Sequence, residues 1–182
     1  MKSLRGAGLG LKLCMIMLAC LLVGVLAMPL AAAGAAKTTT VRIKVVMWGP
    51  RPQVLPVVDD AKNHFMGVGR RTGEAVFSDG RKAAYSNVFT FDMRRGKSLL
   101  SQGYTKMEFK DGSWICFKWK SAAVGMDQNG PVTKGEGTII QGTGPYQGIK
   151  GVAKFSGRNL PPDPKRPKGA SEATAELTYT LP

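Results

Sequence analysis

Few side chains in this sequence have the types and the spacing that catalysis or metal binding requires. His64 is the only histidine, which excludes a metal site built from several histidines, and we expect neither a metal nor a cofactor. A serine-hydrolase triad would need His64 as its base, but the sequence contains no G-x-S-x-G nucleophile elbow. We therefore predict that His64 lies at the rim of the fold or at the end of a strand.

Glu108 is the candidate for a catalytic acid or base. In the strands predicted around it, Glu108 shares one face with Lys106 and Lys118. If this face points into the fold, burial raises the pKa of the Glu108 carboxyl group, which could then transfer a proton. If the face points outward, Glu108 pairs with one of these lysines, and the lysines favour this arrangement. Glu136, in "TKGEGT", poses the same choice.

A glycine-rich stretch, "GTIIQGTGPYQGIKGVAKFSG" at residues 137–157, first suggests a phosphate-binding loop. The dinucleotide fingerprint G-x-G-x-x-G needs a shorter spacing after Gly144 and a helix after it, whereas "VAKFSG" alternates as a strand does. The stretch also lacks the Gly-Lys-Ser/Thr that ends a nucleoside-triphosphate loop. Both nucleotide sites are excluded, and a corner between two strands is favoured.

The glycines at such a corner have structural roles. We expect Gly142 and Gly144 to adopt positive φ. We expect Gly148 and Gly151 to let a neighbouring strand or ring approach closely. Tyr146 lies between these pairs and could plug one end of a barrel.

The rest of the chain is predicted to be β-structure, because no segment keeps a 3.6-residue apolar period for three turns. Short alternating runs bounded by Gly, Asp and Pro predict eight antiparallel strands, typical of a sandwich or a closed barrel. The predicted strands cover residues 38–48, 64–78, 81–92, 99–109, 113–121, 133–141, 149–157 and 173–181. Two proline-rich links, 49–60 and 159–170, are predicted to be loops or rims.

The segment "FKDGS", residues 109–113, predicts a hairpin whose register can be derived. A three-residue loop with Gly112 in the left-handed conformation sets Met107 opposite Ile115, which makes one face mostly apolar. The face that carries Glu108 is then the polar one. A two-residue loop would mix polar and apolar side chains on both faces.

The alternation also predicts which large apolar side chains share the interior. We expect them to form a core or, if that core is incompletely filled, to line a cavity for an apolar ligand. The candidate ligand-binding residues are Phe89, Phe91, Met107, Phe109, Ile115 and Phe117.

The segment from Gly142 to Gly151 resembles the strand–corner–strand of the allene oxide cyclase and dirigent superfamily, which carries Gly-Thr/Ser-Gly-x-Phe/Tyr-x-Gly-x-x-Gly at this place. It also resembles the same segment of small exported bacterial proteins of unassigned function. The resemblance implies an eight-stranded antiparallel, calycin-like barrel with an apolar cavity, often found as a homotrimer. Relatives cyclise a fatty-acid epoxide without a cofactor or hold phenoxy radicals while they couple. The motif contains none of their catalytic residues, so no catalytic role is carried over.

Residues 1–36 are predicted to be a signal peptide. A basic start, the apolar run "LCMIMLACLLVGVLAM" and a stretch of small residues follow one another. A membrane anchor is the alternative, although the apolar run is short for a spanning helix; a lipoprotein modified at Cys20 is another. We expect cleavage near Ala36, export to the periplasm or beyond, and one β-barrel domain at residues 37–182, with Cys116 as its single cysteine.

The domain left after cleavage would be strongly basic. The whole chain has a net charge of +14, and loss of the three basic residues in the signal peptide leaves +11. Such a charge indicates nucleic acid inside a cell. For an exported domain we expect no nucleic acid but an anionic surface, such as lipid head groups, acidic polysaccharide or acidic proteins. A role in solubility alone is the alternative.

Three functions remain open on the sequence. The barrel could bind a small apolar or amphipathic molecule, act as a cofactor-free cyclase or isomerase of the allene oxide cyclase kind, or dock its basic surface on an anionic envelope component. A buried acid facing a cavity would favour the enzyme. A filled barrel with a one-sided basic patch would favour docking, and an apolar cavity would favour ligand binding.

Overall fold

The computed structural model describes residues 37–57, 62–164, 166 and 169–182. They belong to one compact unit, Ala36–Pro182. The predicted signal peptide and its cleavage site lie outside the described residues. In the part of the chain that is described, no helix is long and apolar enough to cross a membrane.

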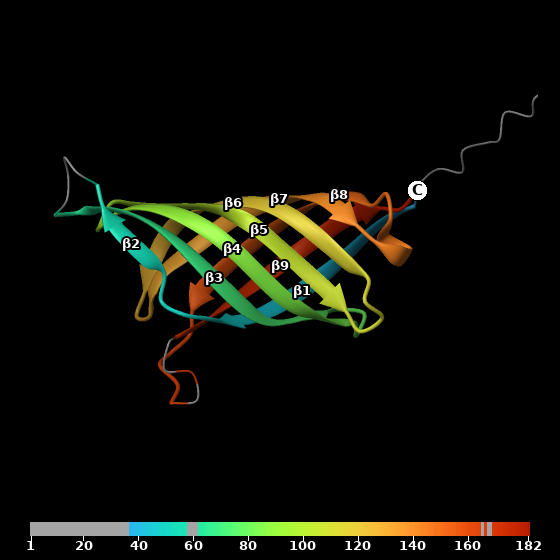
Figure 1. Ribbon diagram of the computed structural model, residues 1–182, viewed down its shortest axis with the longest axis horizontal. Helices are drawn as coiled ribbons and strands as arrows, with labels where there is room; N and C mark the ends of the chain where they lie inside the picture. The colour runs from blue at the N-terminus through green and yellow to red at the C-terminus, as the bar shows by residue number, and fades with distance from the viewer. Residues whose placement is uncertain (1–36, 58–61, 165, 167–168) are drawn as a thin grey trace, which may run out of the picture. The chain divides into compact units, whose positions relative to one another are not determined.

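The described residues form one antiparallel sheet, which curves round on itself (Figure 1). The strands are β1 (Thr38–Trp48), β2 (Gln53–Pro56), β3 (His64–Phe77), β4 (Lys82–Arg94), β5 (Ser98–Phe109), β6 (Trp114–Asp127), β7 (Gly130–Gly142), β8 (Lys150–Asn159) and β9 (Ala170–Thr180). Their order in the sheet is β1-β9-β8-β7-β6-β5-β4-β3-β2, and β1 also pairs with β3. This pairing closes all strands except β2 into an eight-stranded barrel, so the predicted all-β barrel is confirmed.

Residues 49–60, predicted to be a loop or a rim, also contain the short strand β2, which was not predicted. It pairs with the first part of β3, from Gln53 opposite Val68 to Pro56 opposite Phe65, while β1 pairs with the last part of β3. A proline cannot donate to a strand ladder, but it is tolerated on an edge strand, which β2 is. The second proline-rich link was predicted correctly, because β8 ends at Asn159 and β9 begins at Ala170.

The predicted hairpin register between β5 and β6 is confirmed. Met107 lies opposite Ile115, and Glu108 lies opposite Trp114. Gly112 has a φ of 82°, the left-handed conformation that the three-residue loop requires. The apolar face of this hairpin points into the barrel.

Inward and outward residues alternate along each strand, as the pleat requires. On β1 the side chains of Val41, Ile43 and Val45 are buried, while the residues between them are exposed or half-buried. His64 begins β3, as predicted, and its Nε2 atom lies 2.8 Å from Asp92 Oδ1.

Candidate functional site

The interior of the barrel contains a cavity of about 220 Å³. Its wall comes from the inward faces of the closed sheet, and most of the wall is apolar. Arg158, whose side chain is 60 % exposed, belongs to the lining near the end of β8. The cavity therefore reaches the surface at the end of the barrel where β2 lies, opposite the C-terminus in Figure 1. We call this end the mouth.

The opposite end is closed by a stack of aromatic rings. Tyr146, in the 3-10 turn η2 (Gly144–Tyr146), is buried, and its ring centroid lies 4.8 Å from that of Phe109. Phe109 in turn lies 5.5 Å from Phe77. Tyr146 thus occupies the position that the sequence suggested for a plug.

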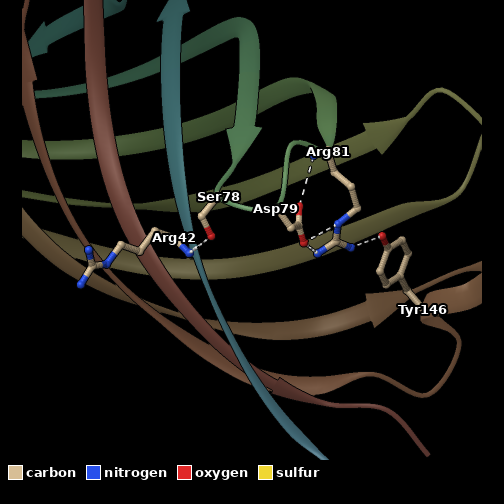
Figure 2. Close-up of polar contacts among 5 residues, drawn as sticks. All are labelled: Arg42, Ser78, Asp79, Arg81 and Tyr146. Atoms are coloured by element: carbon tan, nitrogen blue, oxygen red, sulfur yellow. Dashed lines mark hydrogen bonds and ion pairs between the residues drawn. The ribbon is translucent and has the colours of Figure 1, made fainter.

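Arg81 lies against this stack and ties it to the neighbouring turn (Figure 2). Its guanidinium group donates to Asp79 Oδ2 from Nε at 2.9 Å and from Nη2 at 2.6 Å, and it donates to the Tyr146 hydroxyl at 2.6 Å. The same group lies 5.0 Å from the centroid of Phe77. The hydrogen bond from Arg81 lowers the pKa of the Asp79 carboxyl group. The Arg81 guanidinium group, the Asp79 carboxylate and the Tyr146 hydroxyl therefore all have partners within the fold.

The corner glycines serve this closure in two ways. Gly144 and Gly148 have positive φ, 57° and 75°. The expectation of positive φ at Gly142 was wrong, because Gly142 is instead required for packing: a Cβ atom there would overlap the Tyr146 carbonyl oxygen. Gly151 is also a close approach, since its Cβ would lie 2.8 Å from that of Tyr179.

Of the six candidate ligand-binding residues, three line the cavity and three do not. Phe89, Met107 and Phe117 line the cavity. Phe109 and Ile115 are buried in the core but do not line the cavity. The remaining one, Phe91, packs its ring over Gly67. Ligand contact by the first three stays a prediction.

Glu108 has the outward arrangement that its neighbouring lysines favoured, so the condition for its catalytic role, a carboxyl group pointing into the fold, is not met. Glu108 lies on the outer face of β5, its side chain is 49 % exposed, and Lys106 donates to its Oε2 atom at 2.6 Å. The alternation that places Met107 inside places Glu108 outside, so Glu108 cannot reach a molecule in the cavity. Glu136 is also on the outer face, 3.0 Å from Lys120.

Arg71 is the cavity residue that the sequence analysis missed. It lies on β3, lines the cavity, and donates from Nη1 to the Ser171 hydroxyl at 3.2 Å. Burial lowers the pKa of its guanidinium group, and none of the ion pairs among the described residues includes it. The available signal was the inward face of β3, where Arg71 stands between Gly69 and Gly73.

A polar cluster lies beside Arg71. Asn87 is directly opposite it on β4, and Asn87 Nδ2 donates to the Tyr85 hydroxyl at 2.9 Å. The Tyr85 hydroxyl is also 3.3 Å from Thr105 Oγ1, and burial raises the pKa of Tyr85. Two buried polar atoms in this wall have no protein partner, Asn87 Oδ1 and Trp119 Nε1.

The described residues contain no group of three or more His, Cys, Asp and Glu side chains that could hold a metal. The candidate site is therefore a cavity with an apolar wall, one partly buried cation without a carboxylate partner and a small number of polar atoms. This combination is the one expected of a cavity that could accommodate an amphipathic molecule.

No protein-family model matches the chain, and the search of curated proteins found no match. Among solved structures, it is similar to the pterocarpan synthase dirigent protein GePTS1, with 18 % identity and a TM-score of 0.43 over 79 % of this chain and 90 % of that one. It is also similar to the pterocarpan synthase dirigent protein PsPTS1, with 14 % identity and a TM-score of 0.43 over 79 % and 95 % of the two chains.

Proposed function

We propose that this protein is a binding barrel that holds a small, mostly apolar molecule in its interior cavity. The cavity is the observation that carries the proposal. The interior of an eight-stranded barrel is about wide enough for its own side chains to fill. Here a space remains because small residues occupy inward positions on three adjacent strands, namely Gly137, Ala153, Gly157, Ala173 and Ala175.

The size of the cavity limits the ligand. A volume of 220 Å³ corresponds to about seven water molecules at roughly 30 Å³ each. A compact molecule fits inside, and a longer one would extend through the mouth. The closed end prevents a ligand from passing through, because the Tyr146–Phe109 stack fills the barrel there.

Binding explains the site better than the cyclase alternative does. The alternative relied on a carboxyl group facing the cavity, and both Glu108 and Glu136 face outward and pair with lysines. Glu172 does line the mouth, but Arg158 and Lys44 both bind its carboxylate, which lowers its pKa. A carboxylate held in this way is a poor proton donor near neutral pH.

A second role, docking on an anionic surface, is favoured by the composition of the mouth. Four exposed basic residues lie in the links at this end, Arg51, Lys62, Arg95 and Lys97. Leu55 on β2 is 73 % exposed beside them. Basic and apolar side chains together suit an anionic lipid surface. In this arrangement the mouth would face the membrane from which an apolar ligand could enter. Export of the protein and its assembly into trimers are proposals that do not depend on this docking.

Binding can be tested with N-phenyl-1-naphthylamine, a neutral apolar dye that fluoresces in apolar sites. Ala173→Leu places a larger side chain in the cavity, whereas Thr174→Leu places it on the outer face of the same strand. We expect the first change to weaken dye binding about ten-fold or more and the second to leave it unchanged, since a lost apolar contact of about 1.4 kcal/mol is a factor of ten. Equal binding by all three proteins would refute an interior site.

A further inference from the structure

We propose that the molecule held in the cavity is a small organic acid, and that Arg71 binds its carboxylate. This inference rests on the proposed ligand-binding function and adds the chemical class of the ligand. Its basis is the contrast between the charge of Arg71 and the few partners that the protein gives it.

Arg71 is a partly buried cation with little compensation. A guanidinium group has five N–H donors, and Arg71 uses one of its nitrogens to donate to Ser171 at 3.2 Å. A charge removed from water is unfavourable unless it is paired. A carboxylate entering the cavity would supply both the opposite charge and two acceptor oxygens that match the guanidinium fork.

The one acidic residue of the described cavity wall is already paired with other cations. Glu172 lines the mouth, but Arg158 lies 2.6 Å from its Oε1 atom and Lys44 lies 3.7 Å from its Oε2 atom. Arg158 and Lys44 come from strands on either side of it, β8 and β1. Glu172 is therefore the partner of these two cations, and Arg71 keeps its charge available to a ligand.

Two further buried atoms in the same wall lack protein partners, and they are independent of Arg71. Asn87 is 6 % exposed, its amide nitrogen binds Tyr85, and its Oδ1 atom has no partner. The indole Nε1 of Trp119 is a buried donor, also without a protein partner. Unpaired buried polar groups are rare in folded proteins. A donor such as Trp119 Nε1 suits a carboxylate oxygen, and the Asn87 acceptor suits a hydroxyl group on the ligand.

The protein also holds Arg71 in position from the mouth side. The Ser171 hydroxyl accepts from Arg71 and donates to Asn159 Oδ1 at 3.0 Å. Asn159 Nδ2 in turn donates to the carbonyl oxygen of Asn129 at 3.2 Å. This chain of contacts orients the guanidinium group before a ligand arrives, which reduces the entropy lost on binding.

A single carboxylate fits the charge of the site better than a phosphate does. Arg71 is the one cation of the described cavity wall that has no carboxylate partner, since Arg158 is paired with Glu172. A phosphate monoester carries nearly two negative charges at pH 7, and one of them would remain unpaired. The neighbouring wall, with Phe89, Phe117 and Trp119, provides apolar contact for the body of the acid.

The test compares two probes that differ in their polar group, 2-naphthoate and 2-naphthalenemethanol, by isothermal titration calorimetry on the full chain. We expect 2-naphthoate to bind at least about ten-fold more tightly, the lower range for a charge-assisted hydrogen bond. Arg71→Met should remove this preference. Arg70→Met is the matched control, because Arg70 is the adjacent, exposed residue on the outer face of β3; it should keep the preference.

The outcomes separate the two proposals. If both probes bind equally to the wild type, the assignment of Arg71 is overturned while the binding barrel stands. If neither binds, both are overturned. If Arg71→Met does not fold, the wild-type comparison still decides, with the methyl ester of 2-naphthoate as a third probe that should bind like the alcohol. Tighter binding of the ester than of the acid would contradict the proposal.

Discussion

Arg81 and Arg71 belong to opposite ends of the same barrel, and they differ in what surrounds their guanidinium groups. Arg81 donates to Asp79 and Tyr146 and lies over the ring of Phe77. Arg71 donates to one serine hydroxyl, beside a cavity and two unpartnered polar atoms. The first arginine has its partners inside the fold, and the second has most of its hydrogen-bonding capacity left over.

This difference separates stability from function within one architecture. At the closed end, aromatic stacking, a positive-φ glycine and an ion pair all act to keep the barrel shut. At the mouth, small residues leave space, and the positive charge of Arg71 has no carboxylate partner. A ligand could fill the space and pair with the charge. Changes at the closed end should therefore affect unfolding, and changes in the cavity should mainly affect binding.

The largest effect is expected at the centre of the aromatic stack. Phe109 lies between Phe77 and Tyr146, so Phe109→Ala should lower the free energy of unfolding by about 3–5 kcal/mol. Phe89→Ala, which removes a ring from the cavity wall, should cost clearly less because one side of that ring already faces open space. Urea denaturation measures both, and equal losses would remove the distinction between the two ends.

The next effect concerns the backbone of the closing corner. Gly144 has a φ of 57°, which a β-branched residue adopts only with strain, so Gly144→Val should destabilise the fold by roughly 1–3 kcal/mol. Gly125 is the control, because it lacks positive φ and has open space where a Cβ would stand. Gly125→Ala should change the melting temperature little. A Gly144→Val variant that melts with the wild type would show that the corner is unconstrained.

The paired arginine should matter moderately for stability. Arg81→Met leaves Asp79 and the Tyr146 hydroxyl without their donor, and we expect a loss of about 1–2 kcal/mol, the lower range for hydrogen bonds to charged groups because the site is partly exposed. Chemical denaturation of this variant is the measurement. An unchanged midpoint would mean that water replaces Arg81 at no cost.

The smallest effect is a change in acid sensitivity. The Arg81 hydrogen bond lowers the pKa of Asp79 below its usual 3.8. A carboxyl group whose pKa is lower in the folded than in the unfolded state stabilises the protein at pH values above the unfolded-state pKa. This contribution to the free energy of unfolding is lost as the pH falls from about 4 through the folded-state pKa. Arg81→Met should therefore lose less stability than the wild type below pH 4. The pKa values of Asp111 and Glu172 are also lowered, so these two carboxyl groups should still make the stability of Arg81→Met sensitive to acid.

Features set by local alternation could be predicted from the sequence. The β5–β6 register followed from the apolar pattern and Gly112, and the two lysines beside Glu108 correctly indicated an outward face. The short strand β2 was missed because the prolines of residues 49–60 indicate a loop, unless the segment lies at the edge of a sheet. That edge is a property of the closed barrel and not of the segment.

The candidate site was less predictable, because it depends on what the interior leaves unfilled. Phe89 and Phe117 were recognised as inward residues, but alternation cannot tell a filled core from a cavity. Arg71 was missed because alternation places one of two adjacent arginines on the inner face only where the strand has no bulge. The sequence does not show whether a bulge is present at this position. The glycines on either side, Gly69 and Gly73, marked the inward face, and their lack of side chains makes room for the rings and backbone that approach them.

The most direct test measures two quantities on the same two variants, Arg71→Met and Arg81→Met: the melting temperature without ligand and the affinity for 2-naphthoate. We expect the two variants to give opposite results. Arg71→Met should melt at or above the wild-type temperature, because a partly buried charge without a carboxylate partner is removed, and should lose its preference for the acid. Arg81→Met should melt lower and keep that preference. An Arg71→Met protein that melts as low as Arg81→Met and still prefers 2-naphthoate would contradict the account.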